Sequence, residues 1–192
     1  MASCLVGSEM CIRDRSNDSE INLNLCQDIE AVADYIGKIS IEQQSKNHDP
    51  TETIDQSTSL LGSHFIVGGQ IKGQDPNLVM VYPEGNFIYV ADETPFIQIG
   101  ETKYGKPILD RMIFPHTPLG DSARAALLSF DSTMKSDLTV GPPIDFVVFK
   151  KDQINLNFQD QLKLDSPFFK ELSSIWAEQL AVSYTHLTLP TS

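Results

Sequence analysis

The histidines are the first residues to test for chemistry, and their spacing fits no catalytic or metal site. They are His48, His64, His116 and His186, scattered along the chain. A zinc site draws its ligands from closely spaced residues, so structural or surface roles are favoured for all four. The sequence also has no G-x-S-x-G, H-E-x-x-H or C-x-x-C motif and no phosphate-binding P-loop. We therefore expect no metal and no other cofactor.

A second group of chemically capable side chains follows a predicted helix, and it comprises Ser136, Asp137 and Thr139. For Ser136 and Thr139, capping of the helix end explains the residue types as well as a functional role does. Asp137 differs, because a negative charge at a helix C-terminus opposes the helix macrodipole. That placement favours a functional role for Asp137.

The stretch that must position these residues is 122–149, which predicts a helix, a sharp break and a buried strand. Gly141-Pro142-Pro143 ends the helix, and the β-branched and aromatic run Ile144–Phe149 follows. One helix face is apolar and comprises Ala123, Leu127, Phe130 and Met134. Small residues on the other faces, including Ala125, Ser129 and Ser132, suit close approach of another helix, within the fold or from a neighbouring chain.

The remaining pattern predicts an α/β (α+β) protein. A helix from Leu25 ends at Gly37, a polar surface loop spans 42–59, and a second helix runs from about Gly105 to Ile113. A last helix begins at Pro167. Its expected core face is Phe168, Leu172, Ile175 and Trp176. The expected strands are His64–Ile71, Leu78–Tyr82, Phe87–Ala91, Phe96–Ile99, Ile144–Phe149 and Asn155–Phe158. Two sheets faced by helices, a four-layer αββα sandwich, would satisfy these apolar runs.

We exclude both ends of the chain from the fold prediction. Residues 4–15 and 182–192 resemble translated sequencing adapters, which suggests a foreign leader at 1–15, a partial domain at 16–180 and a foreign tail at 181–192. Cys26 is then the one cysteine of the central part, so a reducing compartment such as the cytoplasm fits.

The net charge of −12 argues against nucleic acid and anionic lipid as partners. No apolar run is long enough to span a membrane.

Four longer segments carry a family resemblance. They are HFIVGGQIKG (64–73), VYPEGNFI (81–88), QIGETKYGKPILDR (98–111) and SFDSTMKSDLTVG (129–141). Together they resemble the bacterial proteasome-type proteases of the Anbu (ancestral β-subunit) group, over roughly residues 26–180. That group is related to proteasome β-subunits and to bacterial HslV. The resemblance implies the N-terminal-nucleophile hydrolase fold, with its first strands lacking here.

The resemblance also implies a chemistry and a candidate site. Such enzymes cleave peptides with an N-terminal threonine, helped by a lysine and an aspartate, and all three come from the first strands. No segment here matches those strands, so we expect no catalytic residue and no activity in the chain as given. The residues that match the wall of the family's site are Gly100, Glu101, Ser136, Asp137 and Thr139. Glu101 departs from the pattern, because classical β-subunits place a serine there.

The expected partners are peptide substrates and further copies of the chain, in a ring or a helical oligomer, with no nucleic acid and no membrane. An alternative function is a non-catalytic structural or assembly subunit of the same fold. An ordinary α/β binding protein is a third reading.

Overall fold

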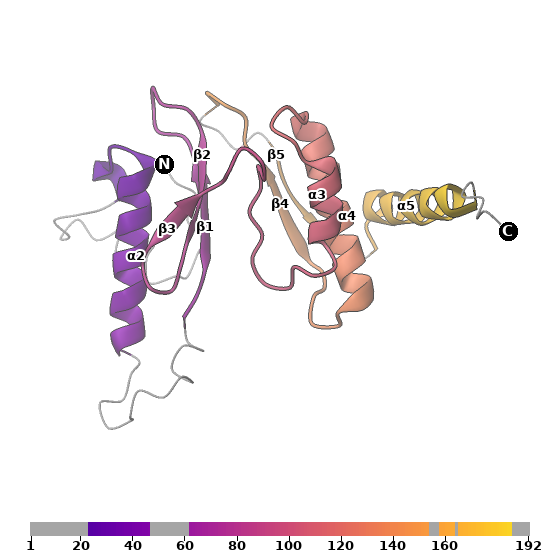
Figure 1. Ribbon diagram of the computed structural model, residues 1–192, viewed down its shortest axis with the longest axis horizontal. Coiled ribbons are helices and arrows are strands. Elements are labelled where there is room, and N and C mark those ends of the chain that lie inside the picture. The colour runs from indigo at the N-terminus through magenta and orange to yellow at the C-terminus, as the bar shows by residue number, and fades with distance from the viewer. Residues whose placement is uncertain (1–22, 47–61, 154–157, 164, 186–192) are drawn as a thin grey trace, which may run out of the picture. The chain divides into compact units, whose positions relative to one another are not determined.

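The computed structural model describes residues 23–46, 62–153, 158–163 and 165–185. The predicted leader 1–15, His48, His186 and most of the predicted loop 42–59 lie outside these ranges. The chain divides into two compact units (Figure 1). The first comprises residues 1–99 with 150–155, and the second comprises 100–149 with 156–192. Both units combine helices with antiparallel strands, which confirms the predicted mixed α/β class.

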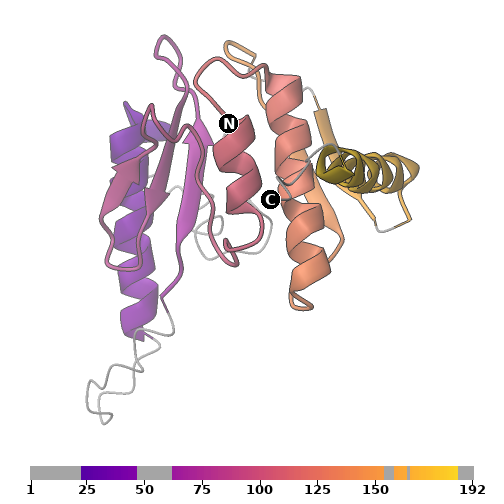
Figure 2. The ribbon, with the colours of Figure 1, turned by 45° about the vertical axis from the view of Figure 1, so that its right-hand side comes forward.

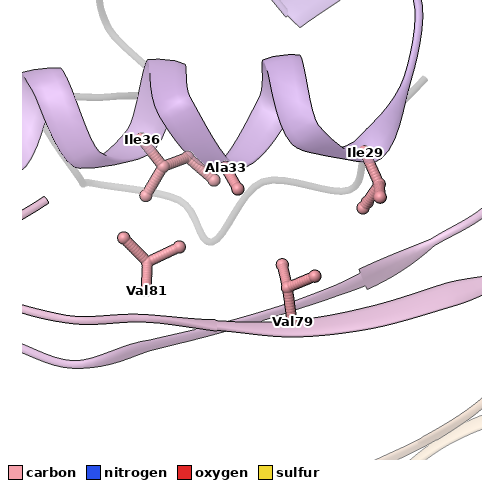
Figure 3. Packing of buried hydrophobic residues seen from close by; sticks show 5 residues of the cluster. All are labelled: Ile29, Ala33, Ile36, Val79 and Val81. Atoms are coloured by element: carbon pink, nitrogen blue, oxygen red, sulfur yellow. The ribbon is translucent and has the colours of Figure 1, made fainter. Parts of the chain in front are cut away.

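The first unit is a three-stranded antiparallel sheet covered on one face by a helix. The strands β1 (Phe65–Gly69), β2 (Asn77–Val81) and β3 (Phe87–Tyr89) lie in the order β1-β2-β3. The helix α2 (Ile29–Lys46) follows a short 3-10 turn, η1 (Leu23–Leu25). Its buried side chains point at the sheet, where they meet two buried valines of β2 (Figure 3). These five residues are Ile29, Ala33, Ile36, Val79 and Val81.

A contact between two glycines explains why the prediction for the end of α2 was wrong. Gly37 does not cap the helix; α2 continues through it to Lys46, so residues 42–46 are helical and not part of a loop. A Cβ at Gly37 would lie 2.3 Å from the carbonyl oxygen of Gly85 in the β2–β3 turn. Gly85 itself has a φ of +87°, which favours glycine. Gly37 is therefore needed for close packing between helix and turn, a tertiary role that a local signal does not reveal.

The predicted strand Phe96–Ile99 is also wrong, since these residues are in no strand. An isolated bridge pairs Ala91 with Thr94, and the amide of Phe96 donates to the carbonyl of Thr94 at 2.8 Å. A strand exists only where a neighbouring strand pairs with it. No named strand pairs with residues 96–99 within the described ranges.

The turn at Lys150–Gln153 is hydrogen-bonded to the loop after β1, within the first unit. The amide of Asp152 donates to Gln70 Oε1 at 2.7 Å, and Gln70 Nε2 donates to Asp152 Oδ1 at 2.7 Å. Lys151 also forms an ion pair with Asp75. This pair lowers the pKa of Asp75 and raises the pKa of Lys151, chiefly through the hydrogen bond between them.

The second unit is a two-stranded sheet, β4 (Ile144–Val148) and β5 (Phe158–Leu162), packed against helices α4 (Leu119–Ser136) and α5 (Pro167–Thr185). The core contains Leu127, Ile144, Leu162 and Phe169. A shorter helix, α3 (Lys106–Met112), lies beside α4 (Figure 2). Pro107 sits in its first turn, where the missing N–H costs little.

In this unit, one strand was predicted at the wrong position and one helix was predicted with a partly wrong buried face. The strand expected at Asn155–Phe158 is displaced: β5 begins at Phe158, and residues 155–157 lie outside the described ranges. On α5 the core face contains Phe169 and Leu172, whereas Phe168 and Ile175 are half exposed. A shift of one residue rotates the side chain by about 100° around the helix, so the sequence period was right at Leu172 but placed Phe168 and Ile175 in the core and missed Phe169. The helix α5 also continues to Thr185, into the segment set aside as a tail.

Candidate active-site wall

The first segment of the predicted wall is a turn that leads into α3. Gly100 has a φ of +84°, in the left-handed region that favours glycine. The next residue, Glu101, accepts a hydrogen bond at Oε1 from the backbone amide of Lys103, at 2.8 Å. The amide of Lys106 then donates to the carbonyl of Thr102 at 2.9 Å and starts the helix. The carboxylate of Glu101 therefore shapes this turn.

The second segment is the C-terminal end of α4. Ser136 is its last residue, and the amide of Asp137 closes the helix by donating to the carbonyl of Thr133 at 2.8 Å. Asp137 Oδ1 then accepts two hydrogen bonds from Thr139, from the amide and from Oγ1, both at 2.7 Å. A carboxylate that bonds the backbone two residues ahead forms an Asx turn. These bonds offset the unfavourable position of a negative charge at a helix C-terminus.

The same bonds fix the charge of Asp137. Its pKa is lowered, first by the Thr139 hydroxyl and then by the Thr139 amide, against a smaller opposing effect of burial. The ammonium of Lys103 lowers it further, which means that the two wall segments lie close enough to interact electrostatically. Asp137 is therefore an anion at neutral pH. Lys103 was missed in the sequence, because no spacing rule relates a lysine in one turn to a distant helix end.

All five predicted wall residues lie in the second unit. Asp137 is partly exposed, while Gly100, Ser136 and Thr139 are exposed, and Glu101 is partly exposed. Between Asp137 and Thr139, Leu138 projects fully into solvent. The wall thus presents an anionic acceptor beside a hydroxyl, a combination that can hold an ammonium or amide N–H group. It brings Asp137 and Thr139 into contact, and the charge of Lys103 is the smallest of the influences on Asp137.

Other chemically capable groups have structural explanations. His64 packs edge-on against Tyr82, with ring centroids 5.5 Å apart. Residues 23–46, 62–153, 158–163 and 165–185 contain no cluster of His, Cys, Asp and Glu that could hold a metal ion. In the same ranges, no helix is long and apolar enough to cross a membrane.

A groove of about 430 Å³ lies between α4 and α5. Asp131, only 5% exposed, lines it, and Lys135 Nζ lies 2.9 Å from Asp131 Oδ2. The geometry of that contact is an ion pair and not a hydrogen bond. Lys135 Nζ also donates to Ser173 Oγ on α5, at 3.1 Å. We interpret this network as a link between the two helices.

Comparison with solved structures gives the same family over most of the chain. No protein-family model and no curated protein matches it. Solved structures do match. Anbu (ancestral beta-subunit) from Yersinia bercovieri is 32% identical with a TM-score of 0.84, covering 94% of this chain and 73% of that chain.

Two further structures agree. The helical assembly of the Anbu complex from Pseudomonas aeruginosa is 33% identical with a TM-score of 0.85, covering 95% of this chain and 73% of that one. An Anbu (Gly-1) mutant from Hyphomicrobium sp. strain MC1 is 38% identical with a TM-score of 0.81, covering 94% and 72%. This chain belongs to the Anbu family. The proteasome-type fold predicted from the sequence is confirmed by these Anbu neighbours.

Proposed function

We propose that this Anbu chain is part of a threonine-type peptidase subunit, and that its wall segments support the nucleophile of the intact protein. The observation that carries the proposal is the Asp137–Thr139 turn, which holds an anion and a hydroxyl together at the end of α4. The similarity to Anbu structures over 94–95% of the chain supports the family setting in which such a wall has a catalytic role.

The chemistry would begin at an N-terminal threonine outside these 192 residues. Its hydroxyl attacks the peptide carbonyl and its α-amine takes the proton, which an amine with a pKa of roughly 8 can do at neutral pH. An anionic Asp137 suits the neighbourhood of that amine, because a nearby negative charge stabilises the ammonium formed when the proton is taken. In this proposal the wall residues position the amine and are not themselves nucleophiles.

We also propose that the intact protein assembles from copies of itself, as the described helical assembly of the Pseudomonas aeruginosa relative suggests. The cytoplasm is the proposed location, since Cys26 is the one cysteine of the central part of the chain. Peptides are the proposed substrates.

The test uses the 192-residue chain and a longer protein encoded by the same gene with its upstream DNA. The longer protein should hydrolyse fluorogenic peptides and be blocked by threonine-directed inhibitors, and the 192-residue chain should not. Asp137→Asn in the longer protein should lower kcat by roughly 10- to 100-fold, because a nearby opposite charge shifts the pKa of its partner by about 1–3 units. Asp110→Asn, on the exposed face of α3, is the matched control.

Two results would contradict the proposal. A longer protein that assembles but cleaves no peptide would favour a non-catalytic assembly subunit. Inhibitor-sensitive cleavage by the 192-residue chain would show that the nucleophile lies within it.

A further inference from the structure

The groove between α4 and α5 is open because the side chains of α5 that line it are mostly short. Lys170, Ser173, Ser174 and Ala177 recur at spacings of three, one and three residues, so they lie along one face of α5. Serine and alanine side chains at three of these positions leave space between the helices. The resulting volume of about 430 Å³ lies in the range of roughly 300–1,000 Å³ that small-molecule pockets have.

A buried acceptor lines the α4 side of this groove. Asp131 is buried, and its Oδ2 atom accepts no hydrogen bond from any described residue. Lys135 Nζ lies 2.9 Å from Oδ2 outside hydrogen-bond geometry, and the same ammonium donates to Ser173 Oγ. Buried polar atoms in proteins almost always have a hydrogen-bond partner, so Asp131 Oδ2 calls for a further donor. The side chain of Lys135 is 55% exposed and flexible, so it can move aside for one.

The groove also offers a cation and an apolar surface. Lys170 is exposed, and no side chain in the described ranges pairs with its ammonium. Met134 and Phe169 line the groove as well and belong to the hydrophobic core of the unit. A complementary ligand therefore has a donor for Asp131, an anion for Lys170 and an apolar body between them.

We propose that this groove binds a short apolar peptide whose two ends are free. The α-ammonium of the peptide donates to Asp131 Oδ2, its carboxylate pairs with Lys170, and its side chains lie on Met134 and Phe169. A simple amine would leave Lys170 without an anion, and a simple carboxylate would leave Asp131 Oδ2 without a donor. The two ends of a peptide satisfy both groups at once.

The products of peptide hydrolysis belong to this class of ligand, because each cleavage creates one new amine and one new carboxylate. The groove would bind such a peptide whether or not the protein forms it. The inference therefore does not rest on the proposed peptidase activity.

An NMR titration of the full 192-residue chain with the dipeptide leucyl-leucine tests the inference. The backbone amide signals of Asp131, Lys135 and Ser173 should shift and saturate, with a Kd of about 0.1–1 mM for a ligand of this size. N-acetyl-leucyl-leucine lacks the ammonium and leucyl-leucine amide lacks the carboxylate. Each should bind at least about tenfold more weakly, because one charged group of the groove then remains unpaired. These two ligands test the roles of Asp131 and Lys170 without altering the protein.

Variants of α5 test the location of the site. Ser174→Phe fills the groove from an exposed position, so it should weaken binding of leucyl-leucine at least about tenfold while the fold is retained. Ser183→Phe is the matched control, because Ser183 is exposed on the same helix and does not line the groove. Lys170→Gln should weaken binding by about three- to tenfold, and Lys163→Gln, at another exposed lysine of the same unit, should not. Urea unfolding and the NMR spectrum of each variant check that it is folded.

Four results would overturn the inference. They are the absence of saturable shifts up to about 10 mM dipeptide, binding of N-acetyl-leucyl-leucine as tight as that of leucyl-leucine, equal effects of Ser174→Phe and Ser183→Phe, and binding of octanoate as tight as that of the dipeptide. The last would mean that the groove takes apolar carboxylates in general. Peptidase activity does not enter the measurement, so a failed peptidase proposal and a failed peptide site are distinguishable.

Discussion

Thr139 directs two hydrogen bonds at one carboxylate oxygen of Asp137, and so it influences the charge of that residue. Thr139→Val keeps the backbone bond and the shape of the side chain but removes the hydroxyl. The pKa of Asp137 should then rise toward its ordinary value, because the hydroxyl is the largest cause of its lowering. Carboxyl chemical shifts in an NMR pH titration measure this. Thr117→Val, in the α3–α4 connection, should leave Asp137 unchanged.

The sign of the effect on stability follows from the lowered pKa. A carboxyl group whose pKa is depressed by folding stabilises the fold above its unfolded pKa, and this contribution is lost as pH falls through the folded pKa. Unfolding midpoints of wild type and Thr139→Val should therefore differ at neutral pH and converge in acid. A difference that persists below both pKa values would mean that packing of the side chain, and not the charge of Asp137, is responsible.

Some properties of individual residues can be predicted from the sequence, and others depend on contacts between distant parts of the chain. The positive φ at Gly85 was predictable, because the surrounding sequence, Pro83-Glu84-Gly85-Asn86, is typical of a tight turn. The wall residues as a set were found through family resemblance, and only Asp137 had a local signal, its negative charge at a helix C-terminus. Lys103 acts across space on Asp137, and one sequence contains no information about that distance.

At the scale of elements, the contact between α2 and the β2–β3 turn depends on the absence of a side chain. Gly37→Ala should destabilise the chain by about 1–3 kcal/mol, because its Cβ would meet a backbone oxygen that has no freedom to move aside. Urea unfolding measures the loss. Gly120→Ala in the first turn of α4 is the control: a Cβ there meets nothing within 4 Å, and the change should stabilise by up to about 1 kcal/mol.

The α4–α5 link depends on a buried charge. Lys135→Met removes the partner of Asp131 and leaves its carboxylate buried, so the free energy of unfolding should fall by about 1–3 kcal/mol. Lys135 is itself 55% exposed, which keeps the estimate below that for a fully buried pair. Adding Asp131→Leu to Lys135→Met should restore most of the loss, because it removes the unpaired charge.

Lys46→Met is the matched control, since its ion pair with Glu42 is exposed at both ends and should be worth at most about 1 kcal/mol. Equal losses for Lys46→Met and Lys135→Met would contradict a special role for burial. So would a double variant less stable than Lys135→Met alone.

The order of helices and strands was easier to predict than the side of each helix that is buried. Apart from the strand expected at 96–99, the order of strands and helices followed from apolar runs and turn residues. The regularly spaced apolar residues Ile29, Ala33 and Ile36 do form the buried face of α2. The faces of α4 and α5 were wrong at Phe130, Phe168 and Ile175. A helix that is apolar over a wide arc has several candidate core faces, and the choice depends on where its neighbours lie.

For the whole molecule, the net charge of −12 opposes any pairing of two copies. If the intact protein assembles from copies of itself, as proposed above, salt should strengthen that association, because screening reduces the repulsion while apolar contacts remain. The Kd should fall by several-fold between about 0.05 and 0.3 M NaCl, where the screening length drops from roughly 14 to 6 Å. Association that weakens with salt would instead indicate that ion pairs between the copies outweigh the repulsion between their net charges.

The exposed position of Leu138 has a practical consequence. Its two neighbours are fixed by their mutual hydrogen bonds, while its own side chain touches solvent and supports no packing. A fluorescent label could be attached to Leu138→Cys in a chain whose three native cysteines are replaced by serine. The backbone under the label would be held in place by the hydrogen bonds of its neighbours, and the core would not be disturbed. Its emission would change when a peptide, an inhibitor or a neighbouring chain reaches the wall. One labelled protein would thus report occupancy of the wall in real time, even in a form that performs no catalysis.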